Sequence, residues 1–359
     1  MIISRTPLRI SFAGGGSDLP AFYCQENGAV VSTAINKYIY IVVNRKFDEK
    51  IRASYSQTEI VDTIDELHHE LIREALKLRG IKGGIEVTSI SDIPSRGTGL
   101  GSSSSYTVGL LNALYAYTGS NVDPERLAME ACEIEIERCE KVLGKQDQYI
   151  AAYGGFQFIR FNRDESVYID PIICKPETRK ALNEGMLMLY TGLTRSSTGI
   201  LEEQSANTNS NPQNRALLRK MVELAYQLRD ALQANDLVAF GDILHAGWIA
   251  KRQLAQHVTS EKIDAWYERA RRTGALGGKL LGAGGGGFLL FYAPPERHED
   301  IVRALPELRA VPFVFEPQGS KIVYIEENGL SRDSKLYQRA WLSSNKVNAV
   351  FQKQPVAEL

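Results

Sequence analysis

The chain has 359 residues, enough for two domains, and its basic and acidic side chains nearly cancel to a net charge of −1. This balance gives no support to nucleic acid or a membrane surface as a partner, and no apolar run approaches the length of a membrane span. Four scattered cysteines without a C-x-x-C pair indicate reduced thiols, and five histidines without a ligand cluster argue against structural zinc.

Strands and helices are both predicted in the first half of the chain. Segments rich in β-branched and aromatic residues predict strands over 8–13, 30–34, 38–44 and 84–90. Apolar residues at helical spacing predict helices over 62–79, which Gly80 ends, and over 103–117. A third helix is predicted from the Asp-Pro pair at 123–124, a cap followed by a first-turn proline, to Gly144.

The second half is mainly helical before it returns to strands. A polar loop is predicted over 205–214, and helices follow over 213–234, 236–256 and 259–273. After a glycine cluster we predict a strand over 288–292, a helix near 295–305, and strands over 311–315 and 321–325. We therefore divide the chain into an N-terminal domain (1–175), a C-terminal domain (176–329) and a tail (330–359). The tail is polar and basic with little pattern, which fits an ordered extension, a disordered end or added sequence.

The segment from position 94 to 105, Pro-Ser-Arg-Gly-Thr-Gly-Leu-Gly-Ser-Ser-Ser-Ser, carries the strongest functional signal. Three glycines at alternate positions allow successive N–H groups to converge on an anion. The serines then begin the predicted helix, where unpaired N–H groups and the helix dipole favour phosphate. We therefore predict a loop for the phosphates of a nucleoside triphosphate, formed by Pro94, Gly97, Gly99, Leu100, Gly101, Ser102, Ser103 and Ser104.

A flexible linker and a Walker loop are the alternatives for this segment. Gly-Ser-rich segments are more often linkers, but this one lies between a predicted strand and an amphipathic helix. The chain contains no Gly-x-x-x-x-Gly-Lys-Ser/Thr, and Lys279 follows a shorter glycine run and precedes Leu280. The pattern favours a phosphate loop that is not of the Walker type.

A second glycine turn follows the first predicted strand, which carries Arg9. The strand ends in Gly14, Gly15 and Gly16, and the polar pair Ser17 and Asp18 follows. An aspartate after such a turn is often only a turn or capping residue. A glycine triplet also admits a ligand close to the backbone, and the aspartate could then accept hydrogen bonds from sugar hydroxyls.

A carboxylate run precedes a third polar segment. Glutamates at 130, 133, 135, 137 and 140 stud the predicted helix, and a solvated face is the default interpretation of such a run. Asp147 differs because it follows the end of that helix, stands between two glutamines and is followed by a glycine pair at 154–155.

The glycine cluster near the end of the chain contains a formal Gly-x-Gly-x-x-Gly at Gly282, Gly284 and Gly287. A dinucleotide fold needs a strand before this pattern and a helix after it, whereas here a strand follows. We therefore interpret the cluster as a loop that shapes an active site against the other domain.

Together these motifs resemble the superfamily of galactokinase, homoserine kinase, mevalonate kinase and phosphomevalonate kinase, the GHMP kinases. Three motifs occur in the order typical of that family, at 7–18, 94–105 and 279–287. Within it the chain looks most like the D-glycero-D-manno-heptose 7-phosphate kinases, through the segments 13–18, 144–148 and 191–196. Glycines stand where the galactokinase motif has Glu and His, which argues against galactose as the acceptor.

The resemblance implies an α+β, two-domain GHMP kinase fold. Its N-terminal domain would be similar to domain 2 of ribosomal protein S5, and its C-terminal domain would be ferredoxin-like with added helices. Carried over by position, Asp147 matches the catalytic aspartate, Arg9 the basic residue of the first motif, and Ser103 a magnesium ligand. Glu137 is the expected second magnesium ligand, with Glu133 as the fallback. The expected acceptor contacts are Gly14, Gly15, Gly16, Ser17, Asp18, Arg195, Gly284 and Gly285.

The implied activity is an ATP- and Mg²⁺-dependent transfer of phosphate to the anomeric hydroxyl of D-glycero-D-manno-heptose 7-phosphate, for nucleotide-activated heptose biosynthesis. Arg195, which lies among hydroxyl residues after an apolar run, is expected to hold the acceptor's phosphate, and a surface arginine is the plainer alternative. Another anomeric acceptor, such as a fucose- or mannose-like sugar, and a non-catalytic sugar-binding relative are the alternative functions. With no signal-peptide pattern, we expect a cytoplasmic protein whose partner is a small sugar phosphate, with a homo-oligomer left open.

Overall fold

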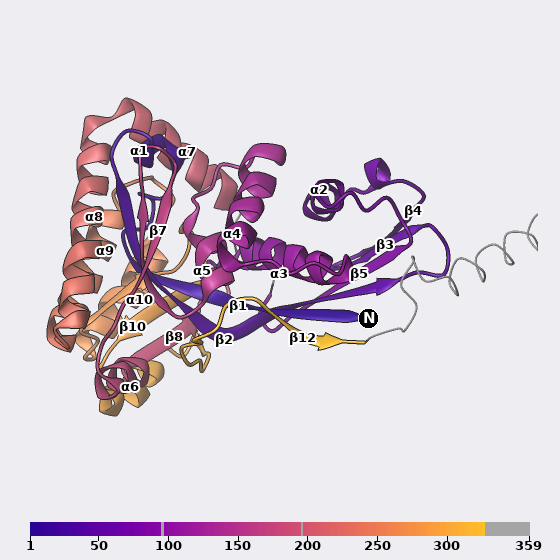
Figure 1. The fold of residues 1–359 in the computed structure, drawn as a ribbon. Coiled ribbons are helices and arrows are strands. Elements are labelled where there is room, and N and C mark those ends of the chain that lie inside the picture. Colours follow the sequence, from indigo (N-terminus) through magenta and orange to yellow (C-terminus); the bar gives the residue numbers. More distant parts are fainter. Residues whose placement is uncertain (95–96, 195–196, 327–359) are drawn as a thin grey trace, which may run out of the picture.

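Two β-sheets and the helices packed on them make up the computed structural model, which describes residues 1–94, 97–194 and 197–326 (Figure 1). The larger sheet has the order β12-β1-β2-β5-β3-β4, with β6 paired to β2 and β7 paired to β6. Its strands are β1 (Ile2–Ala13), β2 (Gly28–Arg45), β3 (Ile51–Ser54), β4 (Thr58–Val61), β5 (Ile85–Ser91), β6 (Phe156–Phe161), β7 (Val167–Pro171) and β12 (Lys321–Ile325). All of its pairs are antiparallel except β3 with β5.

Strand β2 joins two segments that the sequence predicts as separate strands. Its first part pairs with β6 and its second part with β5, so one long strand changes partner along its length. The register with β1 shifts where Pro7 meets Leu8, and this shift bends the pair. The predicted break at 35–37 is therefore a change of partner, and not a turn.

The helices of the first half are α1 (Pro20–Tyr23), α2 (Glu70–Leu78), α3 (Ser102–Tyr117), α4 (Pro124–Cys132) and α5 (Gln146–Tyr153), with a 3-10 turn, η1 (Ile64–Glu66), before α2. Helices α3 and α5 pack on β1 and β2, whereas α1 packs on α7 of the second half. The predicted helix over 62–79 is thus shorter, because the ring of His69 caps α2 at the N–H of Ile72. A π-helical segment, η2 (Glu133–Arg138), continues α4 and ends before the predicted Gly144.

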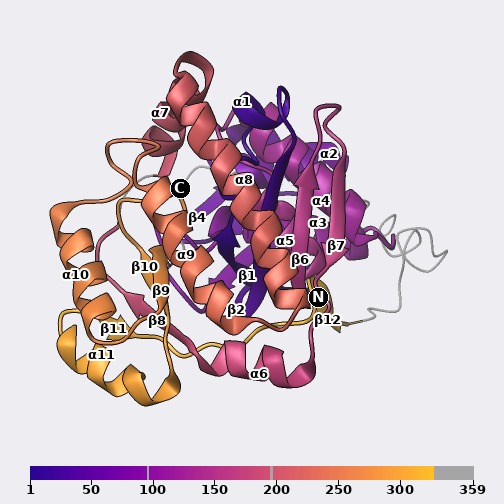
Figure 2. The same ribbon diagram turned by 90° about the vertical axis from the view of Figure 1, so that its left-hand side faces the viewer.

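The second half forms a smaller sheet of order β11-β8-β10-β9. Its strands are β8 (Met186–Tyr190), β9 (Gly277–Leu280), β10 (Phe288–Tyr292) and β11 (Arg309–Ala310). Helices α8 and α9 lie side by side and link the sheets, since α8 contacts β1 and β2 while α9 contacts β9 (Figure 2). The helices are α6 (Pro176–Glu184), α7 (Ser197–Ser210), α8 (Pro212–Gln233), α9 (Leu237–Lys251), α10 (Glu261–Arg272), η3 (Pro295–Arg297) and α11 (His298–Ala304).

Two predictions for this half are wrong. The segment predicted as a loop over 205–214 lies mostly in α7, because Ile200, Gln204 and Thr208 repeat at helical spacing and are buried. The predicted strand over 311–315 is also absent; β11 ends at Ala310, and the chain then crosses to the larger sheet, where Phe315 bridges Ile35.

One hydrophobic core runs through both halves of the molecule. Phe12 of β1 packs edge-on against Phe156, Phe240 and Phe315, which come from three distant parts of the chain. Strand β12, at the end of the interval predicted as the C-terminal domain, pairs with β1 of the first sheet. Within the described ranges, no helix is both long enough and apolar enough to cross a bilayer.

Candidate active site

A cavity of about 590 Å³ lies where the two halves of the molecule meet. Its walls come from the glycine turn after β1, the loop before α3, the start of α5 and the glycine loop between β9 and β10. Among the predicted site residues, those that line it are Arg9, Gly15, Gly16, Asp18, Gly97, Gly99, Gly101, Ser102, Ser103, Ser104, Asp147 and Gly284. The structure therefore brings the three predicted motifs to one cavity.

Arg9 joins three segments of this cavity. Its Nε and Nη2 donate to the two carboxylate oxygens of Asp147, at 2.5 and 2.6 Å. Its Nη1 donates to the carbonyl oxygen of Gly99 at 2.6 Å, and its backbone N–H donates to that of Leu100. The arginine is almost fully buried, whereas one-fifth of the Asp147 side chain is exposed. Because a bidentate pair fixes both planar groups, the position of Asp147 is set relative to the predicted phosphate loop.

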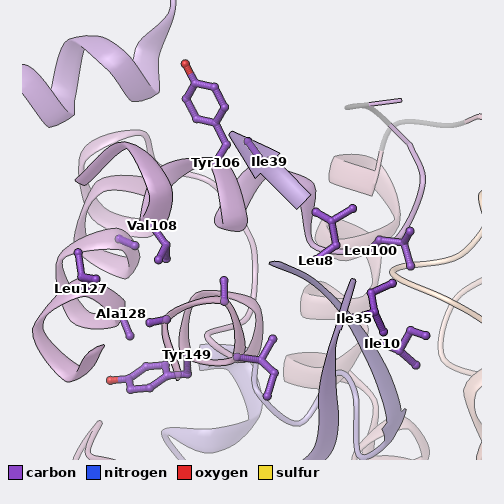
Figure 3. Packing of buried hydrophobic residues seen from close by; sticks show 14 of the residues in the cluster. Leu8, Ile10, Ile35, Ile39, Leu100, Tyr106, Val108, Leu127, Ala128 and Tyr149 are labelled. Atoms are coloured by element: carbon purple, nitrogen blue, oxygen red, sulfur yellow. The ribbon is translucent and has the colours of Figure 1, made fainter. Parts of the chain in front are cut away.

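The predicted phosphate loop is held from two sides. Leu100 is fully buried and lies beside Leu8, Ile10 and Ile35 in the core (Figure 3). On the other side, Gly99 has a φ of +74° and packs on the backbone of the β9–β10 loop, so that a Cβ there would overlap the Leu281 carbonyl. The loop thus points its glycines into the cavity while a leucine anchors it.

Ser103 and Glu135 form a polar pair at the start of α3. The Ser103 hydroxyl donates to Glu135 Oε1 at 2.5 Å, and Gln148 Nε2 donates to Glu135 Oε2 at 2.7 Å. The carboxyl of Glu135 is completely buried, and this burial raises its pKa. A cation beside it would favour the charged form, so these oxygens fit Mg²⁺, which takes few protein ligands beside phosphates and waters.

The two glutamates expected beside Ser103 point elsewhere. Glu137 is exposed and does not line the cavity, while Glu133 accepts from Arg138 at the surface. The expectation of Glu137, with Glu133 as fallback, is therefore corrected in favour of Glu135. The sequence held a signal for this, because Glu135 continues the buried stripe of Leu127, Ala128 and Ala131 on the helix. No cluster of three or more His, Cys, Asp or Glu suited to a metal occurs among the described residues.

Asp18 is a buried carboxylate that lines the cavity beside the glycine turn after β1. It accepts from the N–H of Gly16 at 2.8 Å and from the side-chain amide of Gln146 at 3.0 Å. Burial, followed by the nearby charge of Asp147, raises the pKa of Asp18. A Cβ on Gly144 would overlap this carboxylate, so glycine is needed there for the aspartate to take its place.

Several predicted acceptor contacts have structural positions instead. Ser17 is buried and bonds the carbonyls of Gly14 and Ala29, and Gly14 itself packs on the Ala29 carbonyl. Gly285 donates its N–H to the Val258 carbonyl. Gly14, Ser17 and Gly285 are therefore not part of the cavity wall. The other expected acceptor contact, Arg195, lies outside the described residues.

The polar cavity residues that the sequence interpretation did not assign to the site include Gln204, Lys251 and Lys279. Gln204 lies on α7, one position before the segment 205–214 that the sequence predicts as a loop. Lys251 is the last residue of α9. The sequence held a signal for its burial, because it lies three positions after the apolar Trp248 on the same helix. Lys279 begins the third motif at 279–287, but the sequence assigns its side chain no role; it is buried in β9.

A second cavity, of about 810 Å³, adjoins the first, since Ser102 and Ser103 line both. Pro94 lies in its wall, and the rings of Tyr55, His69 and Tyr106 surround it. The His69 and Tyr106 rings are stacked, with centroids 5.1 Å apart. Aromatic walls next to a phosphate loop suit a flat, partly apolar group such as a nucleotide base.

The comparisons with known proteins agree with this geometry. The descriptions "GHMP kinases N terminal domain" and "GHMP kinases C terminal" match residues 62–155 and 228–309. A D-glycero-alpha-D-manno-heptose 7-phosphate kinase of Campylobacter jejuni is 28% identical over 337 residues, or 89% of this chain and 98% of that one. The L-fucokinase/L-fucose-1-P guanylyltransferase of Bacteroides fragilis is 27% identical over 82% of this chain, which spans only 34% of that longer protein.

Solved structures give the same answer. A D-glycero-D-manno-heptose 1-phosphate kinase from Bacteroides thetaiotaomicron superposes with a TM-score of 0.75 at 26% identity, covering 91% of this chain and all of that one. The fold and the site together define an ATP-dependent phosphotransferase. Models of the GHMP kinase N- and C-terminal domains both match the chain, so its predicted α+β fold and its predicted resemblance to this family are confirmed.

The close packing of the two glycine loops predicts a sharp sensitivity at Gly99. Gly99→Ala introduces a Cβ that overlaps the backbone at Leu281 and should weaken ATP binding by roughly tenfold or more, measured by calorimetry. Gly119→Ala is the matched control: its φ of +71° carries the same strain, but no atom lies within 4 Å of the new Cβ. Equal ATP affinities for the two folded variants would contradict the assigned loop contact.

The pairing of Ser103 with Glu135 predicts which glutamate supports Mg²⁺. Glu135→Gln should raise the Mg²⁺ concentration needed for half-maximal activity by roughly 10–100-fold, because the carboxylate charge is lost beside Ser103. Glu137→Gln, two positions away and exposed, should leave that concentration unchanged. The opposite ranking in a Mg²⁺ titration would restore Glu137 as the ligand.

Proposed function

We propose that this protein is a sugar kinase of the heptose type, which transfers the γ-phosphate of ATP to the anomeric hydroxyl of D-glycero-D-manno-heptose 7-phosphate to give the 1,7-bisphosphate. The observation that carries the proposal is the Arg9–Asp147 pair, which stands between the phosphate loop and the wall that contains Asp18. Relatives named as heptose phosphate kinases, at 26–28% identity over nearly the whole chain, support the sugar class.

The names of the relatives differ on the acceptor. One names a heptose 7-phosphate and the other a heptose 1-phosphate, while the fucokinase relative carries L-fucose-1-P in its name. The name of the fucokinase relative, which contains a sugar 1-phosphate, supports phosphate transfer to an anomeric oxygen by a related protein. A fucose-like free sugar is therefore the second candidate acceptor.

The two adjoining cavities suggest how ATP would lie. The triphosphate fits the loop of Gly97, Gly99 and Gly101 together with the N–H groups at the start of α3. The base would then extend past Ser102 into the aromatic cavity. Mg²⁺, held by Ser103 and Glu135 with the phosphates, would neutralise charge on the triphosphate.

The residues of the chain supply alignment, charge and a proton acceptor. Asp18 accepts hydrogen bonds from acceptor hydroxyls, and Gly15 and Gly16 let the sugar approach the backbone. Asp147 keeps lone pairs free beside its two bonds from Arg9, so it can take the proton of the attacking hydroxyl. As the acceptor oxygen bonds to the γ-phosphorus, the bond between that phosphorus and the leaving oxygen of ADP breaks. Arg9 keeps the Asp147 carboxylate oriented during this step.

The acceptor is best identified by turnover on a panel of sugars. ADP release should be fastest with heptose 7-phosphate. For unphosphorylated heptose, mannose and fucose, kcat/KM should fall by roughly tenfold or more, because these sugars lack the phosphate that the protein would bind. A higher kcat/KM for a free sugar than for any phosphorylated one would overturn the proposed acceptor.

The role of Asp147 predicts a selective loss of turnover. Asp147→Asn keeps the shape but removes the proton acceptor, so kcat should fall by roughly 10²–10⁴ while ATP binding changes little. Asp170→Asn is the matched control, since Asp170 pairs with Arg160 on the exposed surface. A loss of only a few-fold in Asp147→Asn would leave this residue a purely structural role.

A further inference from the structure

Two buried lysines in the cavity have no role in the proposed phosphate transfer. Lys251 and Lys279 are 7% and 4% exposed, and both line the cavity wall that the second half of the chain supplies. Lys251 Nζ donates to the carbonyl oxygens of Leu280 and Gly282, and Lys279 Nζ donates to that of Phe12 at 3.1 Å. Neither ammonium group lies within 4 Å of a carboxylate among the described residues.

The positive charges at these positions are poorly compensated. Asp147 pairs with Arg9, and within the described part of the chain Asp18 is the acid whose charge acts on both lysines. Burial, and then the neighbouring Arg9, lower the pKa of Lys251 to about 8, and burial with the Lys251 and Arg9 charges lowers the pKa of Lys279 well below its usual value. Buried cations without anionic partners are costly, and an anionic ligand would remove that cost.

The lysines face the acceptor side of the cavity. The carbonyl that binds Lys279 belongs to Phe12, two residues before the glycine turn, and the acid that acts on both lysines is Asp18. The phosphates of ATP already have the loop amides and the Ser103–Glu135 pair. We therefore expect the anion that neutralises the two lysines to belong to the acceptor and not to ATP.

Two neutral groups complete this wall. Ser11 Oγ and Gln204 Nε2 are buried and have no hydrogen-bond partner among the described residues. Ideal Cβ positions on Gly15 and Gly16 fall beside Ser11 Oγ and Gln204 Nε2 respectively, so both polar atoms lie next to the glycine turn. A polyhydroxylated ligand would satisfy them, whereas an apolar one would leave them unpaired.

We propose that Lys251 and Lys279 form the binding site for a phosphomonoester that the acceptor already carries, with Ser11 and Gln204 bonding its hydroxyls. A phosphomonoester bears close to two negative charges near neutral pH and matches two ammonium groups. Lys251 has one N–H and Lys279 has two that are not used by the carbonyls named above. The inference rests on the proposed sugar kinase activity and assigns the phosphate to residues of α9 and β9.

The test compares a phosphorylated and an unphosphorylated acceptor in single variants. In Lys251→Gln and Lys279→Gln, KM for heptose 7-phosphate should rise by roughly 30-fold or more, whereas kcat/KM for unphosphorylated heptose should stay within about threefold of the wild type. Lys180→Gln, at an exposed lysine paired with Glu184, is the matched control and should change neither. An equal loss on both acceptors would overturn the inference, because it would place the lysines at the transferred phosphate.

Binding of inorganic phosphate separates this inference from the choice of sugar. Calorimetry should show phosphate binding to the wild type without ATP, and weaker binding to each Gln variant, whichever sugar is the acceptor. If heptose 7-phosphate is not used but phosphate still binds through the lysines, the proposed acceptor fails and the anion site stands. If a Gln variant does not fold, Lys251→Arg and Lys279→Arg replace it and should retain phosphate binding; unaltered phosphate affinity in a folded Gln variant would refute the site.

Discussion

The geometry of the site depends on the hydrogen bonds of one arginine. Arg9 binds Asp147 with two of its nitrogens and the phosphate loop with a third, while its own backbone N–H bonds the same loop at Leu100. A strand of the large sheet, a glycine loop and the start of α5 are thereby fixed to one planar group. A lysine in this position would offer a point charge and no fork, so it could not set all three orientations together.

The second constraint is the close approach of backbone between the two halves of the molecule. Gly99 and Gly282 pack against each other, and Gly287 packs on Thr98, with no room for a Cβ at any of these three glycines. The halves are further joined by a shared core around Phe12 and by β12, which returns to pair with β1. The cavity is consequently a product of both halves, and residues from each face a single bound acceptor.

Much of the site could be predicted from the sequence because its motifs are local. Short segments of the sequence contain the glycine-serine loop, Arg9, Asp18 and Asp147, and the residue types in these segments indicate their chemical roles. The residues that were missed depend on burial in three dimensions. Glu135 looks like one member of a solvated carboxylate run, although its place on the apolar stripe of the helix distinguishes it. Gln204 was hidden by a Ser- and Asn-rich segment that forms a helix because tertiary packing outweighs weak propensity.

A crystal structure of the protein with a non-hydrolysable ATP analogue and heptose 7-phosphate tests the proposed positions of both substrates most directly. We expect the triphosphate on the loop before α3, the anomeric hydroxyl within hydrogen-bond distance of Asp147, and the 7-phosphate bound by Lys251 and Lys279. An acceptor whose anomeric hydroxyl points away from Asp147, or one bound in the aromatic cavity beside Tyr106, would contradict the account.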